Sequence, residues 1–221
     1  MSTKKKPVIY EPVQETQNVV EEPPIVYNVL NLDETKRYTY ADYLTWLDEK
    51  RRELIDGFIY LMSAPVRIHA LISANLSFLI KTFIKKKKGD CHIYYAPFDV
   101  RLPKNNETED NKIYDVVQPD ICVVCDLSKL DDKGCLGAPD LIVEVLSPST
   151  FQKDWNEKFY LYEEAGVREY WLVDPKAKTV HTFLLQPNGK YDAGTAYAYN
   201  QKAPVRIFEG LEIDLNELFE E

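Results

Sequence analysis

Residues 139–146, Pro-Asp-Leu-Ile-Val-Glu-Val-Leu, constrain the fold most, because an acidic residue stands inside an apolar, strand-like run. Side chains alternate between the two faces of a strand, so one face carries Asp140, Ile142, Glu144 and Leu146. An ionised carboxylate at Glu144 is costly to bury unless it is paired or binds a cation. The pattern therefore predicts a cation site or a buried salt bridge around Glu144, or an edge strand that leaves it in solvent.

Hydrophobic periodicity predicts three helices. Apolar residues three and four apart place a long helix within residues 63–89, which ends at Gly89. A shorter helix is expected from Tyr40 to about Lys50, with Thr39 as its cap. A third helix is expected over residues 149–165, where Ser149 can cap the start and Gly166 ends the helix.

The remaining apolar runs predict strands. They lie at residues 92–102, 121–125, 141–146, 170–173, 179–185 and 190–192, with a hairpin over residues 53–62 that turns at Asp56-Gly57. The order of elements indicates an α/β fold with a mixed β-sheet flanked by helices and an additional antiparallel C-terminal hairpin. Residues 36–221 are expected to form a single domain. Residues 1–35, with three lysines against six acids and four prolines, are expected to be a flexible extension.

The net charge of −9 argues against a protein that coats nucleic acid. The charge is unevenly spread, however, because residues 63–89 hold Arg67 and five lysines and no acid. A nucleic-acid role would therefore rest on a local site. The alternative is that these lysines simply favour the C-terminal end of a helix dipole.

The four cysteines are too few for a disulfide scaffold, so reduced thiols are expected. A strand places Cys122 and Cys125 on opposite faces, which argues against a zinc site. No apolar run approaches about 18 residues, and no apolar segment follows the first lysines. These features favour a cytoplasmic protein without a membrane span.

Lys158 occupies a position that packing alone would not favour. Phe151, Trp155, Lys158 and Tyr162 form one stripe of the third helix, and this stripe should face the sheet. An ammonium above a carboxylate can neutralise charge on a phosphate or hold an attacking water. The alternative is a surface ion pair from Asp154 to Lys158, worth about 0.3–0.5 kcal/mol.

Several of these segments together resemble a known family. They are Glu53-Leu-Ile-Asp-Gly, His69 at a helix start, Gln118-Pro-Asp, residues 139–150, Lys158, and residues 166–175 with the sequence Gly-Val-Arg-Glu-Tyr-Trp-Leu-Val-Asp-Pro. This set resembles the Uma-two-like family of restriction endonucleases, within the PD-(D/E)XK restriction-endonuclease-like superfamily. The resemblance extends from about Tyr38 to Asp192.

The resemblance implies a set of site residues. Asp120, Glu144 and the Val145 carbonyl would hold Mg²⁺, with Mn²⁺ as a substitute. Glu53 would be a further ligand of the ion or of water. Leu146 stands where the strict motif has a lysine, and Lys158 from the following helix would replace that lysine and orient or deprotonate the water. His69, Gln118 and Arg67 are the candidates for contact with the substrate; for His69, a satisfied histidine at a helix edge is the alternative.

The implied activity is Mg²⁺-dependent hydrolysis of phosphodiester bonds in DNA, with duplex DNA as substrate and a homodimer as the working form. The alternative is a catalytically inactive nuclease fold that serves as a nucleic-acid-binding or protein-interaction module. An assembly role is also open, with Tyr94-Tyr95 and Tyr170-Trp171 as a dimer face.

Overall fold

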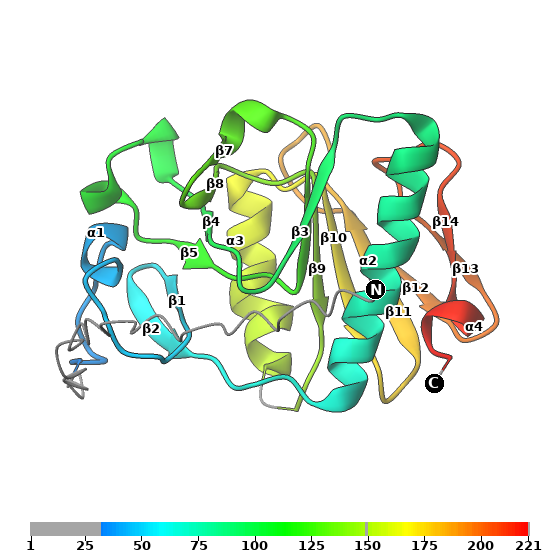
Figure 1. Ribbon diagram of the computed structural model, residues 1–221, viewed down its shortest axis with the longest axis horizontal. Helices are drawn as coiled ribbons and strands as arrows, with labels where there is room; N and C mark the ends of the chain where they lie inside the picture. The colour runs from blue at the N-terminus through cyan, green and yellow to red at the C-terminus, as the bar shows by residue number, and fades with distance from the viewer. Residues whose placement is uncertain (1–31, 149, 221) are drawn as a thin grey trace, which may run out of the picture.

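The structure is a computed structural model that describes residues 32–148 and 150–220. The extension predicted over residues 1–35 lies almost entirely outside the described residues, as does the predicted cap Ser149. The predicted fold class is confirmed, because mixed sheets are flanked by helices and a separate antiparallel strand pair lies near the C-terminus (Figure 1).

The central sheet has six strands in the order β12-β11-β10-β9-β6-β3. Their bounds are β3 His92–Tyr95, β6 Ile121–Val124, β9 Leu141–Val145, β10 Glu169–Asp174, β11 Thr179–Leu184 and β12 Thr195–Ala198. Only β9 and β10 run parallel within this sheet, and the other neighbours are antiparallel. A parallel pair needs a crossover connection, which here contains a helix.

A second sheet has the order β2-β1-β5-β4-β8-β7. Its strands are β1 Arg52–Ile55, β2 Phe58–Leu61, β4 Val100–Arg101, β5 Val116–Val117, β7 Leu130–Asp131 and β8 Gly134–Leu136. The predicted hairpin at Asp56-Gly57 joins β1 to β2. The C-terminal pair is β13 Lys202–Pro204 with β14 Glu212–Asp214.

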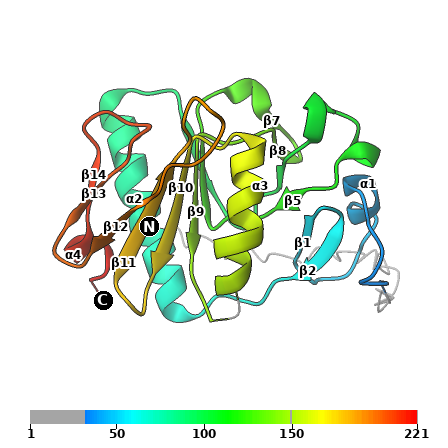
Figure 2. The same ribbon diagram turned by 180° about the vertical axis from the view of Figure 1, so that it is seen from behind.

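Two helices cover opposite faces of the central sheet, as the two views show (Figures 1 and 2). They are α2 Arg67–Lys87 and α3 Lys158–Ala165, and a π-helical turn, Lys153–Glu157, leads directly into α3. The shorter helices are α1 Tyr40–Tyr43 and α4 Leu215–Leu218, with 3-10 turns at Lys104–Asn106, Asp110–Lys112 and Leu127–Lys129.

The alternation predicted for β9 is confirmed. Leu141, Val143 and Val145 pack with α2, whereas Ile142 and Leu146 pack with α3. By length and composition alone α2 could cross a membrane, but four of its residues are buried in the core next to the sheet, Ile72, Leu76, Ile80 and Ile84. Glu144, on the α3 side, is only 4% exposed, so the edge-strand alternative is wrong.

Three predicted elements differ from the structure. The first helix is a single turn; Thr39 caps it in a capping box with Asp42, but Leu47 is 93% exposed, so there is little burial to extend the helix. Residues 92–102 form two strands in different sheets, separated by Pro97, which has no N–H for a strand ladder. Residues 190–192 contribute one isolated bridge, and β12 takes the expected place beside β11.

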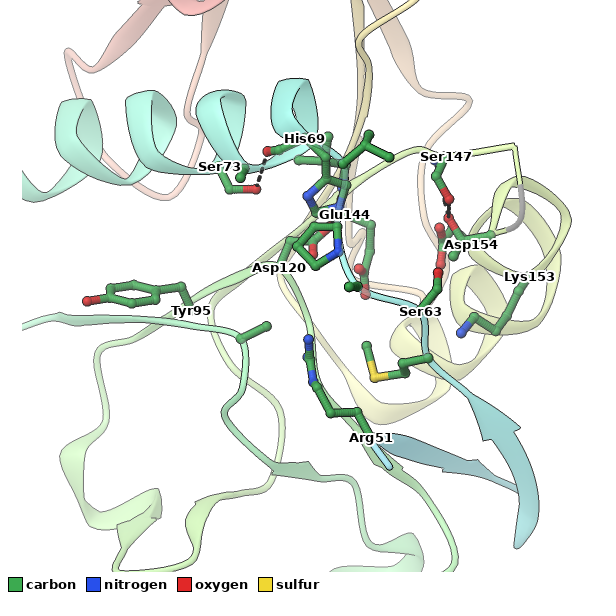
Figure 3. Close-up of a pocket in the computed structure, with 18 of the residues that line it drawn as sticks. Arg51, Ser63, His69, Ser73, Tyr95, Asp120, Glu144, Ser147, Lys153 and Asp154 are labelled. Carbon is green, nitrogen blue, oxygen red and sulfur yellow. Dashed lines mark hydrogen bonds and ion pairs between the residues drawn. The ribbon is translucent and has the colours of Figure 1, made fainter. Parts of the chain in front are cut away.

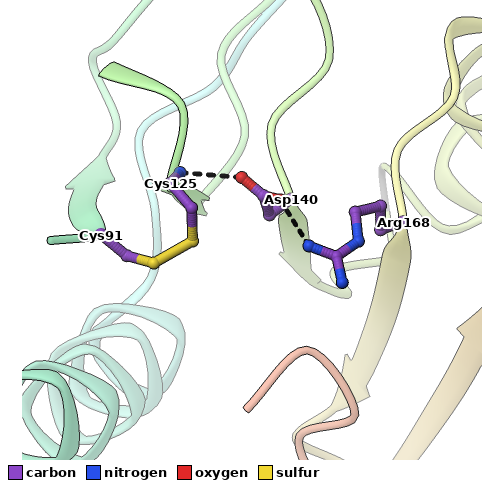
Figure 4. The surroundings of a disulfide bond; sticks show 4 residues. All are labelled: Cys91, Cys125, Asp140 and Arg168. Atoms are coloured by element: carbon purple, nitrogen blue, oxygen red, sulfur yellow. Dashed lines mark hydrogen bonds and ion pairs between the residues drawn. A yellow bond between two sulfur atoms is a disulfide. The ribbon is translucent and has the colours of Figure 1, made fainter. Parts of the chain in front are cut away.

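The expectation of four reduced cysteines is wrong for two of them. Cys91, just beyond α2, and Cys125, just beyond β6, form a disulfide (Figure 4). Beside it, the Asp140 carboxylate accepts hydrogen bonds from the Cys125 backbone N–H and from the Arg168 guanidinium, each at 2.8 Å. Cys122 points to the other face of the sheet and is free and buried.

Reduction of this disulfide should lower the free energy of unfolding by about 2–4 kcal/mol, because the bond closes a loop between residues 34 apart in sequence. Denaturant unfolding with and without reductant measures the effect. The double variant C91S/C125S is the control, and its midpoint should not respond to reductant. An equal midpoint for the oxidised and reduced wild type would contradict the prediction.

The dimer face predicted at Tyr170-Trp171 is wrong, because both side chains are fully buried in β10. Tyr94 stacks on Phe98 at 4.2 Å between ring centroids. Tyr95 alone of the four is largely exposed, at 63%.

Gly134 in β8 has a φ of +123°, and a Cβ there would lie 2.2 Å from the Asp99 carbonyl oxygen. That oxygen accepts the Cys135 N–H, so it cannot move away freely. Gly134→Ala should therefore destabilise the protein by about 1–3 kcal/mol more than Gly189→Ala. Gly189 also has a positive φ, +75°, but open space around it. Thermal unfolding of both variants checks this, and equal losses would contradict it.

Candidate active site

A cavity of about 720 Å³ opens beside the C-terminal end of β9. Its wall comes from the first half of α2, the segment that connects β2 to α2, the loop after β9 and the π turn (Figure 3). Of the predicted site residues, it brings together His69, Asp120, Glu144, Val145 and Lys158.

Glu144 and Lys158 form the buried centre of this site. The Lys158 Nζ lies 2.8 Å from the Glu144 Oε1, and the Tyr162 hydroxyl donates to the same oxygen at 2.7 Å. Lys158 is only 2% exposed, and its Nζ also lies 3.6 Å from the Asp154 Oδ1. The predicted pair of Asp154 and Lys158 thus exists, but it is buried within the site rather than exposed at the surface.

Glu53 reaches the same lysine from the second sheet. Its Oε1 lies 2.8 Å from the Lys158 Nζ and accepts the Gln118 backbone N–H at 3.0 Å. Its Oε2 accepts from the Lys153 Nζ at 2.7 Å. Glu53 is fully buried. Its two ion pairs connect β1 to the π turn, through Lys153, and to α3, through Lys158.

Asp120 lies just before β6 and lines the cavity. Its Oδ2 accepts the Val145 backbone N–H at 2.7 Å and lies 3.0 Å from the His69 Nε2. His69 is thus directed at a predicted metal ligand from the first turn of α2. Figure 3 shows its ring close to Asp120 and Glu144.

The π turn explains how two lysines five residues apart reach one carboxylate. In a regular α-helix, Lys153 and Lys158 would point about 140° apart. Here the Lys158 N–H bonds to the Lys153 carbonyl, five residues back, which widens the turn. Both ammonium groups therefore reach Glu53.

The carboxylates of the site repel one another. Burial, together with the charges of Asp154, Asp120 and Glu53, raises the pKa of Glu144 to about 8, although Lys158 opposes the shift. Burial alone would raise the pKa of Glu53, but Lys158 and Lys153 outweigh it and lower that pKa. Burial would lower the pKa of Lys158, but the carboxylates around it raise it well above its usual range.

The negative charges of the site also act on the pKa of His69. Burial alone would lower its pKa, but the Asp120 and Asp154 charges and the Val145 backbone raise it. The imidazolium form is therefore favoured beside Asp120. The site combines a strongly held ammonium with a carboxylate, Glu144, that is protonated more easily than usual.

Two predicted substrate contacts lie away from the cavity wall. The Gln118 side chain accepts from the Arg51 guanidinium and donates to Asp99, so it positions Arg51, which does line the cavity. Arg67 is exposed at the start of α2 and does not line the cavity. The lysines of residues 85–88 lie about 24 Å or more along α2 from His69, at 1.5 Å per residue.

The residues present suit a hard divalent cation. Among the described residues, no three His, Cys, Asp or Glu side chains are arranged to hold a metal ion by themselves. Mg²⁺ typically takes only one or two protein carboxylates and completes its shell with water and substrate phosphate. Asp120 and Glu144 provide two carboxylates on one cavity, and Asp154 and Glu53 add negative charge near Glu144, which a cation would offset.

The chain matches a family model and several known proteins. Residues 40–216 match the family model Uma2, described as "Putative restriction endonuclease". The uncharacterized protein slr1290 of Synechocystis sp. (strain PCC 6803) is 29% identical over 153 residues, which cover 68% of this chain and 75% of the relative. A second uncharacterized protein of that organism, sll1609, is 30% identical over 145 residues, covering 63% and 76%.

A solved structure shares the fold. The crystal structure from Anabaena variabilis described as a "putative nuclease belonging to DUF820" superimposes with a TM-score of 0.64 at 20% identity. The match covers 82% of this chain and 97% of that one.

Proposed function

Given that this chain belongs to the Uma2 family, we propose that it is an endonuclease that hydrolyses phosphodiester bonds in DNA with the help of Mg²⁺ or Mn²⁺. The observation that carries the proposal is the buried contact of Lys158 with Glu144 and Glu53, beside Asp120 in one cavity. Burial of several charged side chains costs free energy, and such clusters are concentrated at functional sites.

Asp120, Glu144 and the Val145 carbonyl would hold the ion. A bound Mg²⁺ supplies an activated water and stabilises the extra negative charge of the transition state. Lys158, surrounded by three carboxylates, stays an ammonium; it can donate hydrogen bonds to a water or to a phosphate oxygen rather than remove a proton.

The other residues position these groups. Glu53 holds Lys158 and Lys153 in place, and Tyr162 fixes the orientation of the Glu144 carboxylate. The His69 Nε2 faces Asp120 at 3.0 Å, so His69 would orient that carboxylate and, as an imidazolium, add positive charge near a bound phosphate.

The test is incubation of the purified full chain with supercoiled, linear and single-stranded DNA and with RNA, in Mg²⁺, in Mn²⁺ or in chelator. Cleavage of DNA that requires the ion supports the proposal. The competing function is an inactive nuclease-fold binding module. Binding without cleavage of any substrate in either ion would favour that module and contradict an endonuclease.

A further inference from the structure

The cavity continues from the carboxylates along the exposed side of α2, and this part of its wall carries no charge. It is formed by Pro65, Ala70, Ala74, Tyr95 and Ala96. Ala70 and Ala74 are four residues apart, so they lie on one side of α2, and both are exposed. We refer to these five residues as the apolar groove.

The cations of the cavity lie at its other end. Arg51, Lys153 and Lys158 surround the carboxylates, and Gln118 holds the Arg51 guanidinium by hydrogen bonds of 3.0 and 2.8 Å. A ligand that fills the whole cavity therefore needs an anionic group at one end and a flat or apolar group at the other. A nucleotide has both features.

We propose that the apolar groove holds an unpaired nucleotide of the DNA strand, adjacent to the scissile phosphate, with its base stacked on Tyr95. The inference rests on the proposed function, because it takes the carboxylate end as the place of the phosphate. Tyr95 is 63% exposed and stands on the groove wall, so its ring is available to a base. Arg51 is placed to bind the phosphate of the same nucleotide.

The size of the cavity fits this occupant. A volume of about 720 Å³ lies in the range of small-molecule pockets, with room for about one or two nucleotides. A base inside a duplex could enter only after it unstacks and unpairs, which costs free energy. The groove therefore selects single strands, frayed ends and bubbles over continuous duplex.

The experiment measures binding of a short fluorescent single-stranded DNA and of the matched duplex to the full chain, by anisotropy in chelator, where the proposed ion-dependent cleavage cannot proceed. The single strand should bind more tightly than the duplex. Tyr95→Ala should weaken single-strand binding about 5- to 150-fold, the range expected for loss of one stacked base. Ala74→Leu, which fills the groove with a good helix former, should weaken it as well.

Phe78→Ala is the matched control, because Phe78 is an aromatic residue of α2 with 67% exposure that does not line the cavity. It should bind like the wild type. If Tyr95→Ala and Ala74→Leu both bind single-stranded DNA with wild-type affinity and have unchanged circular dichroism, the proposed role of the apolar groove is wrong. Equal affinity of the wild type for duplex and single strand would also overturn it. A preference for single strands without cleavage in Mg²⁺ would contradict only the proposed endonuclease activity. Cleavage without a preference for single strands would contradict only the proposed nucleotide site in the apolar groove.

Discussion

Glu144→Gln should reduce ion-dependent DNA cleavage by about 10²- to 10³-fold or more, because the site loses one of its two carboxylates for the cation. The fold should tolerate the change. Burial and the neighbouring carboxylates raise the pKa of Glu144 to about 8, so its ionised form carries a burial cost that glutamine, which has the same shape without the charge, does not. The glutamine oxygen can still accept from Lys158 and Tyr162.

Cleavage rates and thermal unfolding of this variant are measured together. The melting temperature should stay close to that of the wild type while the rate falls. Glu212→Gln, on the exposed surface of β14, is the control for loss of one negative charge, and it should keep the wild-type rate. A folded Glu144→Gln protein that cleaves at the wild-type rate would contradict the assignment of Glu144.

Lys158→Met should lower the free energy of unfolding by about 3–5 kcal/mol, because it leaves buried carboxylates without their cation. Lys158 Nζ lies within 2.8 Å of both Glu53 and Glu144, and the three side chains are at most 5% exposed. The same substitution removes the ammonium from the proposed catalytic site, so cleavage should also be lost. Denaturant unfolding measures the change in stability.

Lys190→Met is the matched control. Lys190 makes an ion pair with Glu163 at the same distance, 2.8 Å, but its side chain is 69% exposed. Its loss should cost less than about 1 kcal/mol. The double variant K158M/E144Q should recover part of the stability lost in Lys158→Met, since one unpaired charge is removed. Equal losses for the two lysine variants would show that the buried cluster is not a structural centre.

The fold and the centre of the site follow from local patterns in the sequence. Alternation along β9 puts Glu144 on the face opposite Leu141, Val143 and Val145, and Lys158 is buried against the sheet as its stripe predicts, although Phe151 of the same stripe is 41% exposed. Both predictions depend only on strand and helix periodicity. The resemblance supplied Glu53 and Asp120, which periodicity alone would not connect to Glu144.

Other contacts depend on features without a simple sequence signal. Lys153 reaches Glu53 only because the turn before α3 is π-helical, and regular helical spacing would direct it elsewhere. The disulfide joins Cys91, just before β3, to Cys125, just after β6, and only the register of this strand pair, not a count of cysteines, brings the two together. Tyr162 and Asp154 did have a signal, since each lies four residues from Lys158 on the same helix.

The lysines near the end of α2 are close to His69 in sequence but distant from the cavity in space. Lys85 and its neighbours share α2 with His69, yet the length of the helix keeps them away from the cavity. Local positive charge at the site comes instead from Arg51, Lys153 and Lys158, which are separated in sequence.

Asp120 and Glu144 are proposed to hold a divalent cation, and calorimetric titration of the full chain with Mn²⁺ tests this most directly. The wild type should bind one ion in the cavity, and Asp120→Asn and Glu144→Gln should each weaken binding at least about tenfold. Glu212→Gln should bind like the wild type. Absence of binding to the wild type, or equal affinity in all four proteins, would contradict the claim.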